Sequence, residues 1–221
     1  VSKINRLKRI RYTSPHPQDM TDDVLKVMSE NQNICNYIHL PLQSGSDRIL
    51  KRMNRTYNRE DFFVLCDKIK TYMPNCSLST DIIVGFPGER DDDFKQLCDF
   101  VEDVRFDRLG VFMYSEEDGT HAADTMKDNV SKEVKTERMD QLMLLQQKIS
   151  LENNRGLIGS TQDVIIDSHT QDKRSIGRTY RDSPEIDNLV IAGGELSIGE
   201  IYSMKINDAF EYDLLGEVVD G

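Results

Sequence analysis

The chain of 221 residues is long enough for one large domain or two ordinary ones, and 38% hydrophobic with 30% charged residues is typical of a soluble globular protein. No apolar run approaches the roughly 18 residues that span a bilayer, and no signal-peptide pattern opens the sequence, so we expect a cytoplasmic protein with no membrane partner. The net charge of −11 disfavours loose, purely electrostatic binding to nucleic acid and suits basic protein partners.

The first half of the chain alternates between strand and helix patterns. Crossovers of 20 or more residues between the apolar runs indicate a parallel sheet. Four strands cannot close a barrel, so residues 1–120 are predicted to form a partial α/β barrel that is incomplete at its N-terminus. We expect strands at 9–13, 37–42, 78–84 and 108–114, of which the last two are buried, and helices at 22–29, 47–53, 59–73 and 91–104, with Thr21, Ser46 and Asn58 as helix caps.

The second half changes its pattern. A long charged helix at 131–154 is predicted to connect two domains, within a connecting segment at 121–154. From residue 155 the apolar residues follow a period of two in five short runs, which predicts a small, closed antiparallel β-barrel at 155–221. The acidic residues concentrate here, because the chain from Glu152 onward carries a net −8 and the first 151 residues carry −3.

Ligands of α/β sheets bind beyond the carboxyl ends of the strands. The loops expected there are 14–17, 43–46, 85–89 and 115–120, and Gly85 and Gly88 let the main chain approach a ligand closely. Asp81 is the most informative residue, because a carboxylate inside an apolar strand is costly unless it is paired or bound. The alternatives are ordinary: 43–46 could merely end a strand and cap a helix, and Glu116 and Glu117 could lie in a solvated loop.

The four cysteines are far apart in the sequence. Separations of 31, 10 and 22 positions provide no close pair for a metal site or a disulfide framework. Cys66 and Cys98 lie on apolar helix faces, so we expect both to be reduced core residues.

Several of these stretches together resemble one enzyme family. Residues 11–17, His39–Arg48 (HLPLQSGSDR), Met53–Arg55 and Ser79–Glu89 (STDIIVGFPGE) are similar to the methylthiotransferase branch of the radical S-adenosylmethionine enzymes, and the final barrel is similar to their TRAM domain. The resemblance implies a partial α/β barrel in which a 4Fe–4S cluster cleaves S-adenosylmethionine while a second 4Fe–4S cluster relays sulfur to an unreactive carbon. It also implies which residues flank S-adenosylmethionine: Gln43, Ser44, Ser79, Asp81, Gly85 and Glu89, with Gln43 and Asp81 as its polar contacts.

The family's three-cysteine signature is missing from the sequence, as is the domain that holds the second cluster. Both are expected before Val1, so this chain should contain no metal ligand and no catalytic residue and should be inactive alone.

The resemblance leaves two substrates open. Early stretches resemble the type that modifies a transfer-RNA adenosine, while 105–110, 114–120 and 177–187 resemble the type that modifies an aspartate of a small-subunit ribosomal protein. We favour the second type, because an acidic barrel suits a basic ribosomal protein better than a phosphate backbone. Glu116 and Glu117 are then expected to bind substrate, and Arg178 and Arg181 could grip phosphate but are outnumbered by nearby carboxylates. A third hypothesis is a non-catalytic, protein-binding adaptor.

Overall fold

The computed structural model describes residues 1–4, 6–12, 15–184 and 186–219. It divides into two compact units. The sheet unit contains Tyr12–Glu30 and Ile38–Gln146, and the barrel unit contains Val1–Arg11, Asn31–Tyr37 and Gln147–Gly221. Within the described residues, no helix combines the length and the apolar character that crossing a membrane requires.

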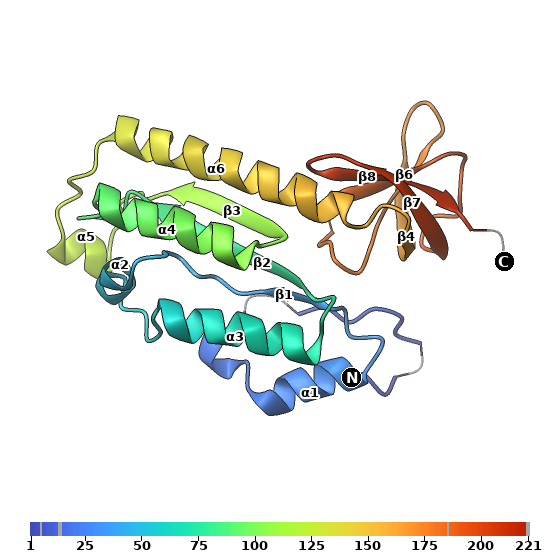
Figure 1. Cartoon of the computed structure of the whole chain (residues 1–221), viewed down its shortest axis with the longest axis horizontal. Helices are drawn as coiled ribbons and strands as arrows, with labels where there is room; N and C mark the ends of the chain where they lie inside the picture. Colours follow the sequence, from blue (N-terminus) through green and yellow to red (C-terminus); the bar gives the residue numbers. More distant parts are fainter. Residues whose placement is uncertain (5, 13–14, 185, 220–221) are drawn as a thin grey trace. The chain divides into compact units, whose positions relative to one another are not determined.

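The sheet unit is built on three parallel strands in the order β1-β2-β3 (Figure 1). Alternate residues of β2 are almost fully buried, with Leu78, Thr80, Ile82 and Val84 at most 2% exposed, so one face of this strand is covered completely. The strands are β1 Tyr37–His39, β2 Ser77–Val84 and β3 Arg108–Met113, and the helices are η1 Pro17–Asp19, α1 Asp22–Glu30, α2 Asp47–Arg52, α3 Arg59–Tyr72, α4 Asp91–Val104, α5 His121–Thr125 and α6 Lys132–Arg155.

The expected strand at 9–13 is wrong for the residues that the structure describes. Ile10 makes one isolated parallel bridge with Ile34, and Thr13 lies outside the described residues. In the described residues the sheet therefore has three strands instead of four.

The first strand is also shorter than expected. β1 ends at His39, since Pro41 cannot donate to a ladder, although the main chain continues to pair with β2 at single points. Leu40 N donates to the Ser79 carbonyl at 2.8 Å and Gln43 N donates to the Asp81 carbonyl at 2.9 Å. The carboxyl end of this segment is therefore held beside β2.

The third strand is not the fully buried strand that its apolar run predicts. β3 lies at the edge of the sheet, where Phe112 is 56% exposed and Met113 is 36% exposed. An apolar run alone does not distinguish an edge strand from a central one.

Two of the predicted helix caps have different outcomes. Asn58 caps α3 as expected, and the structure adds a complete capping box with Asp61. Ser46 occupies the N-cap position of α2 but makes no side-chain cap, because its hydroxyl donates to Asp93 Oδ1 at 2.6 Å. Asp93 is itself a buried side chain of α4 that pairs with Arg48, so the charged acceptor attracts the Ser46 hydroxyl away from the helix amides.

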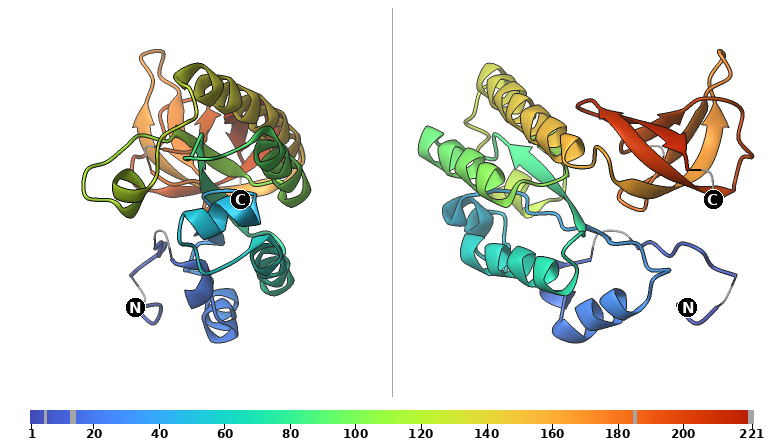
Figure 2. Two further views of the ribbon diagram at one scale, coloured as in Figure 1. Left: turned by 90° about the vertical axis from the view of Figure 1, so that its left-hand side faces the viewer. Right: turned by 45° about the vertical axis from the view of Figure 1, so that its right-hand side comes forward.

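The barrel unit contains the five predicted strands, closed in the order β4-β5-β6-β8-β7 (Figure 2). Four of the pairings are antiparallel and β6 pairs with β8 in parallel. The strands are β4 Thr161–His169, β5 Ser175–Arg178, β6 Leu189–Ala192, β7 Ile201–Ala209 and β8 Asp213–Val218, around a core of Val164, Ile166, Val190, Ala192, Met204, Ile206, Ala209 and Leu214.

Helix α6 contributes residues to both units, which divide it after Gln146. In its last part, Ser150 Oγ donates to the Glu211 carbonyl at 2.6 Å and Asn154 Nδ2 donates to the Phe210 carbonyl at 2.8 Å. The turn between β7 and β8 is thereby fixed to the end of the helix.

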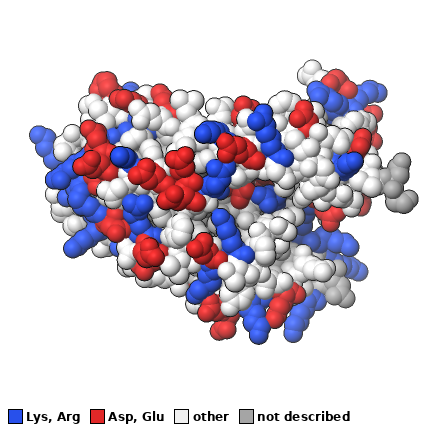
Figure 3. All heavy atoms as spheres, in the orientation of Figure 1, with Lys and Arg blue, Asp and Glu red and all other residues white. Residues whose placement is uncertain are grey.

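Acidic side chains gather over α4 in the space-filling view (Figure 3). This helix begins with three carboxylates, which suits the positive end of its dipole. Its exposed acidic residues are Asp91, Asp92, Asp99, Glu102 and Asp103.

Candidate functional site

The candidate site lies where the three parallel strands end. Because the strands are parallel, the loops 40–46, 85–90 and 114–120 leave the same edge of the sheet, which is where α/β sheets bind ligands. The fourth loop expected there cannot be described as a whole, because Ser14 lies outside the described residues.

Two glycines of the loop after β2 have a main-chain conformation that few other residues adopt. Gly85 has φ 71° and Gly88 has φ 82°, in the left-handed region that favours glycine. Gly85 N donates to Glu89 Oε1 at 2.8 Å, so the loop closes on its own carboxylate. The Glu89 side chain is only 1% exposed, and this burial raises the pKa of Glu89 despite the opposing effects of Gly85 N and Arg138.

Helix α6 holds this loop through a buried ion pair. Arg138 Nη1 donates to Glu89 Oε1 at 2.8 Å, and both side chains are nearly inaccessible, at 6% and 1% exposed. Arg138 Nη2 also donates to Asp91 Oδ1 at 2.7 Å, although the Asp91 side chain is fully exposed. Arg138 was not among the predicted site residues, because no local pattern connects positions 49 residues apart.

A second basic residue of α6 covers the same loop. The stem of Lys135 lies where a Gly85 side chain would be, so this position accepts no larger residue without displacement. Lys135 Nζ donates to the Tyr114 carbonyl at 3.0 Å and pairs with Asp128 Oδ2 at 2.5 Å. The loop after β2 and the end of β3 are therefore held by one lysine.

Asp81 has a protein partner that was not predicted from the sequence. His39 Nε2 lies 3.1 Å from Asp81 Oδ2, and His39 Nδ1 lies 2.9 Å from Ser79 Oγ. Asp81 Oδ1 faces Gly110 on β3, where an added Cβ would come within 2.7 Å of it. The Asp81 side chain keeps 35% of its surface exposed, so the pair with His39 leaves the carboxylate accessible.

Gln43 and Ser44 form the turn after the first strand. Gln43 has φ 72°, and β2 holds its main chain on both sides through the Asp81 carbonyl and Ile83 N, each at 2.9 Å. Ser44 is 1% exposed, and its hydroxyl accepts from Ser46 N at 3.3 Å. Gln43 thus presents a half-buried amide at the strand ends, whereas Ser44 is enclosed in the turn.

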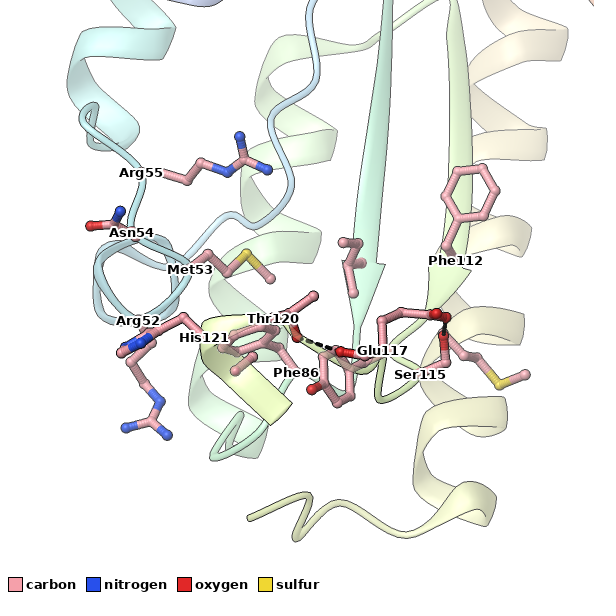
Figure 4. A pocket seen from close by; sticks show the side chains of 14 residues that line it. Arg52, Met53, Asn54, Arg55, Phe86, Phe112, Ser115, Glu117, Thr120 and His121 are labelled. Carbon is pink, nitrogen blue, oxygen red and sulfur yellow. Dashed lines mark hydrogen bonds between the residues drawn. The ribbon is translucent and has the colours of Figure 1, made fainter. Parts of the chain in front are cut away.

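A cavity of about 540 Å³ opens beside these loops (Figure 4). Its walls are mainly apolar and aromatic, with arginines on one side and the loop after β3 on the other. Glu117 lines it, with Ser115 Oγ donating to Glu117 Oε1 at 2.9 Å, while Glu116, Gln43 and Asp81 are not among its lining residues. The lining consists of Arg52, Met53, Asn54, Arg55, Ile83, Phe86, Phe112, Met113, Tyr114, Ser115, Glu117, Thr120, His121 and Ala122.

The two arginines predicted to contact substrate lie in the barrel unit, on β5 and in the loop after it. Arg178 Nε pairs with Asp167 Oδ2 at 3.0 Å, and its side chain is 17% exposed. Its carbonyl accepts from Arg9 Nη1 at 3.0 Å, so the N-terminal segment is bound to the barrel here. Arg181 is half-buried, and its main-chain N donates to the Thr179 hydroxyl at 3.0 Å.

The carboxylates near Arg181 are engaged within the loop. Asp182 is 1% exposed and accepts from the Thr179 hydroxyl at 2.7 Å, and Asp187 accepts from Ser183 N at 2.6 Å. Glu185, the third carboxylate near Arg181 in the sequence, lies outside the described residues. These carboxylates outnumber the arginines in the sequence, but Asp182 is buried and so adds little to the exposed acidic surface.

All four cysteines are free. Cys66 is buried as expected, and burial raises its pKa to about 12, which makes it a poor metal ligand. Cys98 is only partly buried, so its prediction as a core residue is wrong. In the described part of the chain, no three His, Cys, Asp or Glu side chains come together in a way that could hold a metal ion.

Two family models match the chain. Residues 1–101 match the radical SAM superfamily, and residues 158–219 match the TRAM domain. Among solved structures, coproporphyrinogen III oxidase (HemN) from Escherichia coli, a radical SAM enzyme, aligns with a TM-score of 0.53 at 16% identity. The alignment covers 76% of this chain and 44% of that one, and it supports the fold alone.

The sequence relatives are more specific. The ribosomal protein uS12 methylthiotransferase RimO of Clostridioides difficile is 45% identical over 99% of this chain, and that of Citrifermentans bemidjiense is 42% identical over the same share. The tRNA-2-methylthio-N(6)-dimethylallyladenosine synthase of Carboxydothermus hydrogenoformans is 41% identical, again over 99%. This chain spans about half the length of these relatives, with 50%, 49% and 49% of each covered.

The partial parallel sheet, the small closed barrel and these matches agree with one another. The chain belongs to the radical S-adenosylmethionine methylthiotransferase family.

Proposed function

We propose that this chain is part of a radical S-adenosylmethionine methylthiotransferase that modifies an aspartate of the small-subunit ribosomal protein uS12. The observation that supports this most directly is the 45% identity to a uS12 methylthiotransferase over nearly the whole chain. The substrate, the cytoplasmic location and the two 4Fe–4S clusters are parts of this proposal. So are the domain boundaries, at 1–120, 121–154 and 155–221.

The residues at the strand ends suit S-adenosylmethionine. The apolar and aromatic cavity can enclose an adenosyl group, and the exposed part of Asp81 with the Gln43 amide can accept and donate hydrogen bonds beside it. When bound, S-adenosylmethionine would supply the radical chemistry, while this chain binds and orients the cofactor and excludes water. The proposed cofactor residues are Gln43, Ser44, Ser79, Asp81, Gly85 and Glu89.

Glu89 has a distinct part in this proposal. Its carboxylate is bound to Gly85 N and Arg138 and is inaccessible, so it acts by fixing the conformation of the loop after β2. Ser44 and Ser79 are likewise buried: the Ser44 hydroxyl accepts from Ser46 N within the turn, and the Ser79 hydroxyl lies beside His39 Nδ1. Asp81 and Gln43 remain the two side chains proposed to contact S-adenosylmethionine directly.

The second candidate substrate is transfer RNA. It is favoured by the 41% identity to the tRNA-2-methylthio-N(6)-dimethylallyladenosine synthase and by the inward carboxylate of Asp182, which reduces the acidic surface beside Arg181. Under the uS12 proposal, Glu116 and Glu117 contact the basic protein substrate. Under the transfer-RNA alternative, Arg178 and Arg181 contact phosphates of the RNA. A protein-binding adaptor without catalysis is the third candidate.

One experiment separates these candidates. The complete, cluster-loaded enzyme is incubated with S-adenosylmethionine, a sulfur source, a reductant and either uS12 or unmodified transfer RNA. The masses of the products are then measured by mass spectrometry. We expect a methylthio group on uS12. A methylthio group on transfer RNA alone would move the assignment to the second candidate, and the absence of S-adenosylmethionine cleavage would leave the adaptor.

A further inference from the structure

Two arginines of the N-terminal segment bind main-chain carbonyls of the barrel. Residues Val1–Arg11 belong to the barrel unit, as do residues Asn31–Tyr37. Arg9 Nη1 donates to the Arg178 carbonyl at 3.0 Å, and Arg9 Nη2 donates to the Asp163 carbonyl at 2.6 Å. Asp163 lies on β4 and Arg178 lies on β5, and these strands pair with each other, so Arg9 holds the first hairpin of the barrel.

Arg11 binds the loop between β5 and β6. Arg11 Nη2 donates to the Tyr180 carbonyl at 2.7 Å and to the Asp182 carbonyl at 2.8 Å, across 169 and 171 positions of the sequence. The Arg11 guanidinium also lies 4.4 Å from the centre of the Tyr37 ring, close enough for a cation–π interaction. The ring therefore fixes the guanidinium, and the guanidinium fixes two carbonyls of the loop.

These two carbonyls flank Arg181, which is one of the proposed substrate contacts. The described residues between β5 and β6 form no helix or strand, so ladder hydrogen bonds do not fix this loop. Within the loop, Arg181 N donates to the Thr179 hydroxyl at 3.0 Å, and this hydroxyl donates to Asp182 Oδ2 at 2.7 Å. Because Arg11 binds the carbonyls before and after Arg181, it limits the main-chain conformation and thereby the rotamers that the Arg181 side chain can adopt.

The acceptors of these hydrogen bonds are neutral, so both arginines keep their charge. Burial lowers the pKa of Arg9, Cys35 opposes this effect, and the nearby Arg178 and Arg11 lower the pKa further. Three guanidinium groups thus lie close together, which is unfavourable for like charges. Charge-assisted hydrogen bonds are about twice as strong as neutral ones, so the bonds to the carbonyls can offset this repulsion and still hold the loop.

We propose that Arg11 is a positioning residue for the protein substrate: by holding the carbonyls on both sides of Arg181, it keeps this side chain in the direction that contacts the substrate. The inference rests on the proposed function. Residues 177–187 are among the stretches whose sequence favours the uS12 type, so we expect the conformation of this loop to matter for uS12.

The chemistry of the contacts agrees with this role. Because Arg11 binds carbonyls, which every residue has, the side chains of the loop stay available for the substrate. On a protein, the acceptors for the Arg181 guanidinium are carboxylate or main-chain carbonyl oxygens.

The test is a double-mutant cycle in the complete, cluster-loaded enzyme. Arg11→Gln, Arg181→Gln and the double variant are compared with the wild type, and Arg6→Gln is the matched control, because Arg6 is an exposed arginine of the same segment. The KM and kcat for uS12 are measured in each variant, together with uncoupled cleavage of S-adenosylmethionine. Hydrogen exchange of residues 178–183 reports whether the loop is held.

Thermal unfolding of each variant shows whether it is folded. If Arg11→Gln is not folded, Arg11→Lys takes its place in the cycle, since lysine keeps a charged donor but loses the planar fork.

We expect Arg181→Gln to raise the KM for uS12 about tenfold, and Arg11→Gln to raise it by a similar or smaller factor with little change in kcat. The double variant should be no worse than Arg181→Gln alone, because Arg11 acts through Arg181. Exchange of residues 178–183 should be faster in Arg11→Gln and unchanged in Arg6→Gln. Cleavage of S-adenosylmethionine should stay the same in all variants, since the residues proposed to bind it belong to the sheet unit.

Additive losses in the cycle would overturn the proposal, because Arg11 would then act independently of Arg181 and serve only the stability of the barrel. Unchanged exchange in Arg11→Gln would overturn it too, as would an equal loss in Arg6→Gln, since general charge would then explain the effect. A wild type that modifies transfer RNA and not uS12 contradicts the proposed function, while loop exchange and the same cycle with transfer RNA still decide whether Arg11 acts through Arg181.

Discussion

The buried pair of Arg138 and Glu89 allows a quantitative prediction. Arg138→Met leaves the Glu89 carboxylate, 1% exposed, with Gly85 N as its remaining donor. Removing one partner of a buried ion pair costs about 3–5 kcal/mol, because the other charge stays buried. The exposed Asp91 is the matched control, since a surface pair contributes about 0–1 kcal/mol and Asp91→Asn should cost no more than that.

The assay is urea unfolding of this chain followed by far-ultraviolet circular dichroism, in which the helical signal of the sheet unit dominates. The double variant Glu89→Gln with Arg138→Met should recover part of the loss, since no charge then remains buried. Loss of Arg138 raises the pKa of Glu89 further, so the cost should be greatest at neutral pH and should decrease as the pH falls through that raised pKa. A loss below about 1 kcal/mol, or a loss independent of pH, would refute the view that this pair fixes the loop.

Three further predictions concern the same region. Gly85→Ala should lower stability by more than Gly119→Ala in urea unfolding, because both glycines have positive φ but only Gly85 meets a side chain where the Cβ would be; equal losses would contradict this. Asp93→Asn should destabilise at neutral pH, because the pKa of Asp93 is lowered: burial opposes the charge, but Arg48, Ser46 and Arg90 N together favour it. That difference from wild type should disappear as the pH falls below the ordinary aspartate pKa of about 3.9 and through the lowered one, and a constant difference would exclude this cause. In the complete enzyme, Glu116→Lys with Glu117→Lys should slow uS12 modification about tenfold at low salt and reduce S-adenosylmethionine cleavage less; normal modification would favour transfer RNA.

Local patterns in the sequence predict the parts of the fold that depend on neighbouring residues. The cap at Asn58, the turn after β2 and the five strands of the barrel all follow from short spacings and turn residues. β3 and the segment 9–12 were misjudged, because an apolar run does not reveal how many neighbours a strand has. Which strands pair with one another depends on parts of the chain that are far away in the sequence.

The side-chain partners of the site residues could not be predicted from neighbouring residues in the sequence. Glu89 meets Arg138 49 positions later, and Ser46 meets Asp93 47 positions later. His39 is the first residue of the motif His39–Arg48, but only the register of β1 against β2 brings it to Asp81. An acidic residue in an apolar strand could thus be recognised as exceptional before its partner could be named.

The choice between the two substrates also depends on contacts that composition does not show. The net −8 of the carboxyl-terminal region still counts toward the long-range field, since a hydrogen-bonded carboxylate keeps its charge. At short range, however, a phosphate meets only exposed groups, and Asp182 is 1% exposed while Asp167 pairs with Arg178. The charge of the barrel therefore affects the approach of a substrate more than its selection. Selection requires contact with the modified group, so a count of charges in the sequence does not decide between the two substrates.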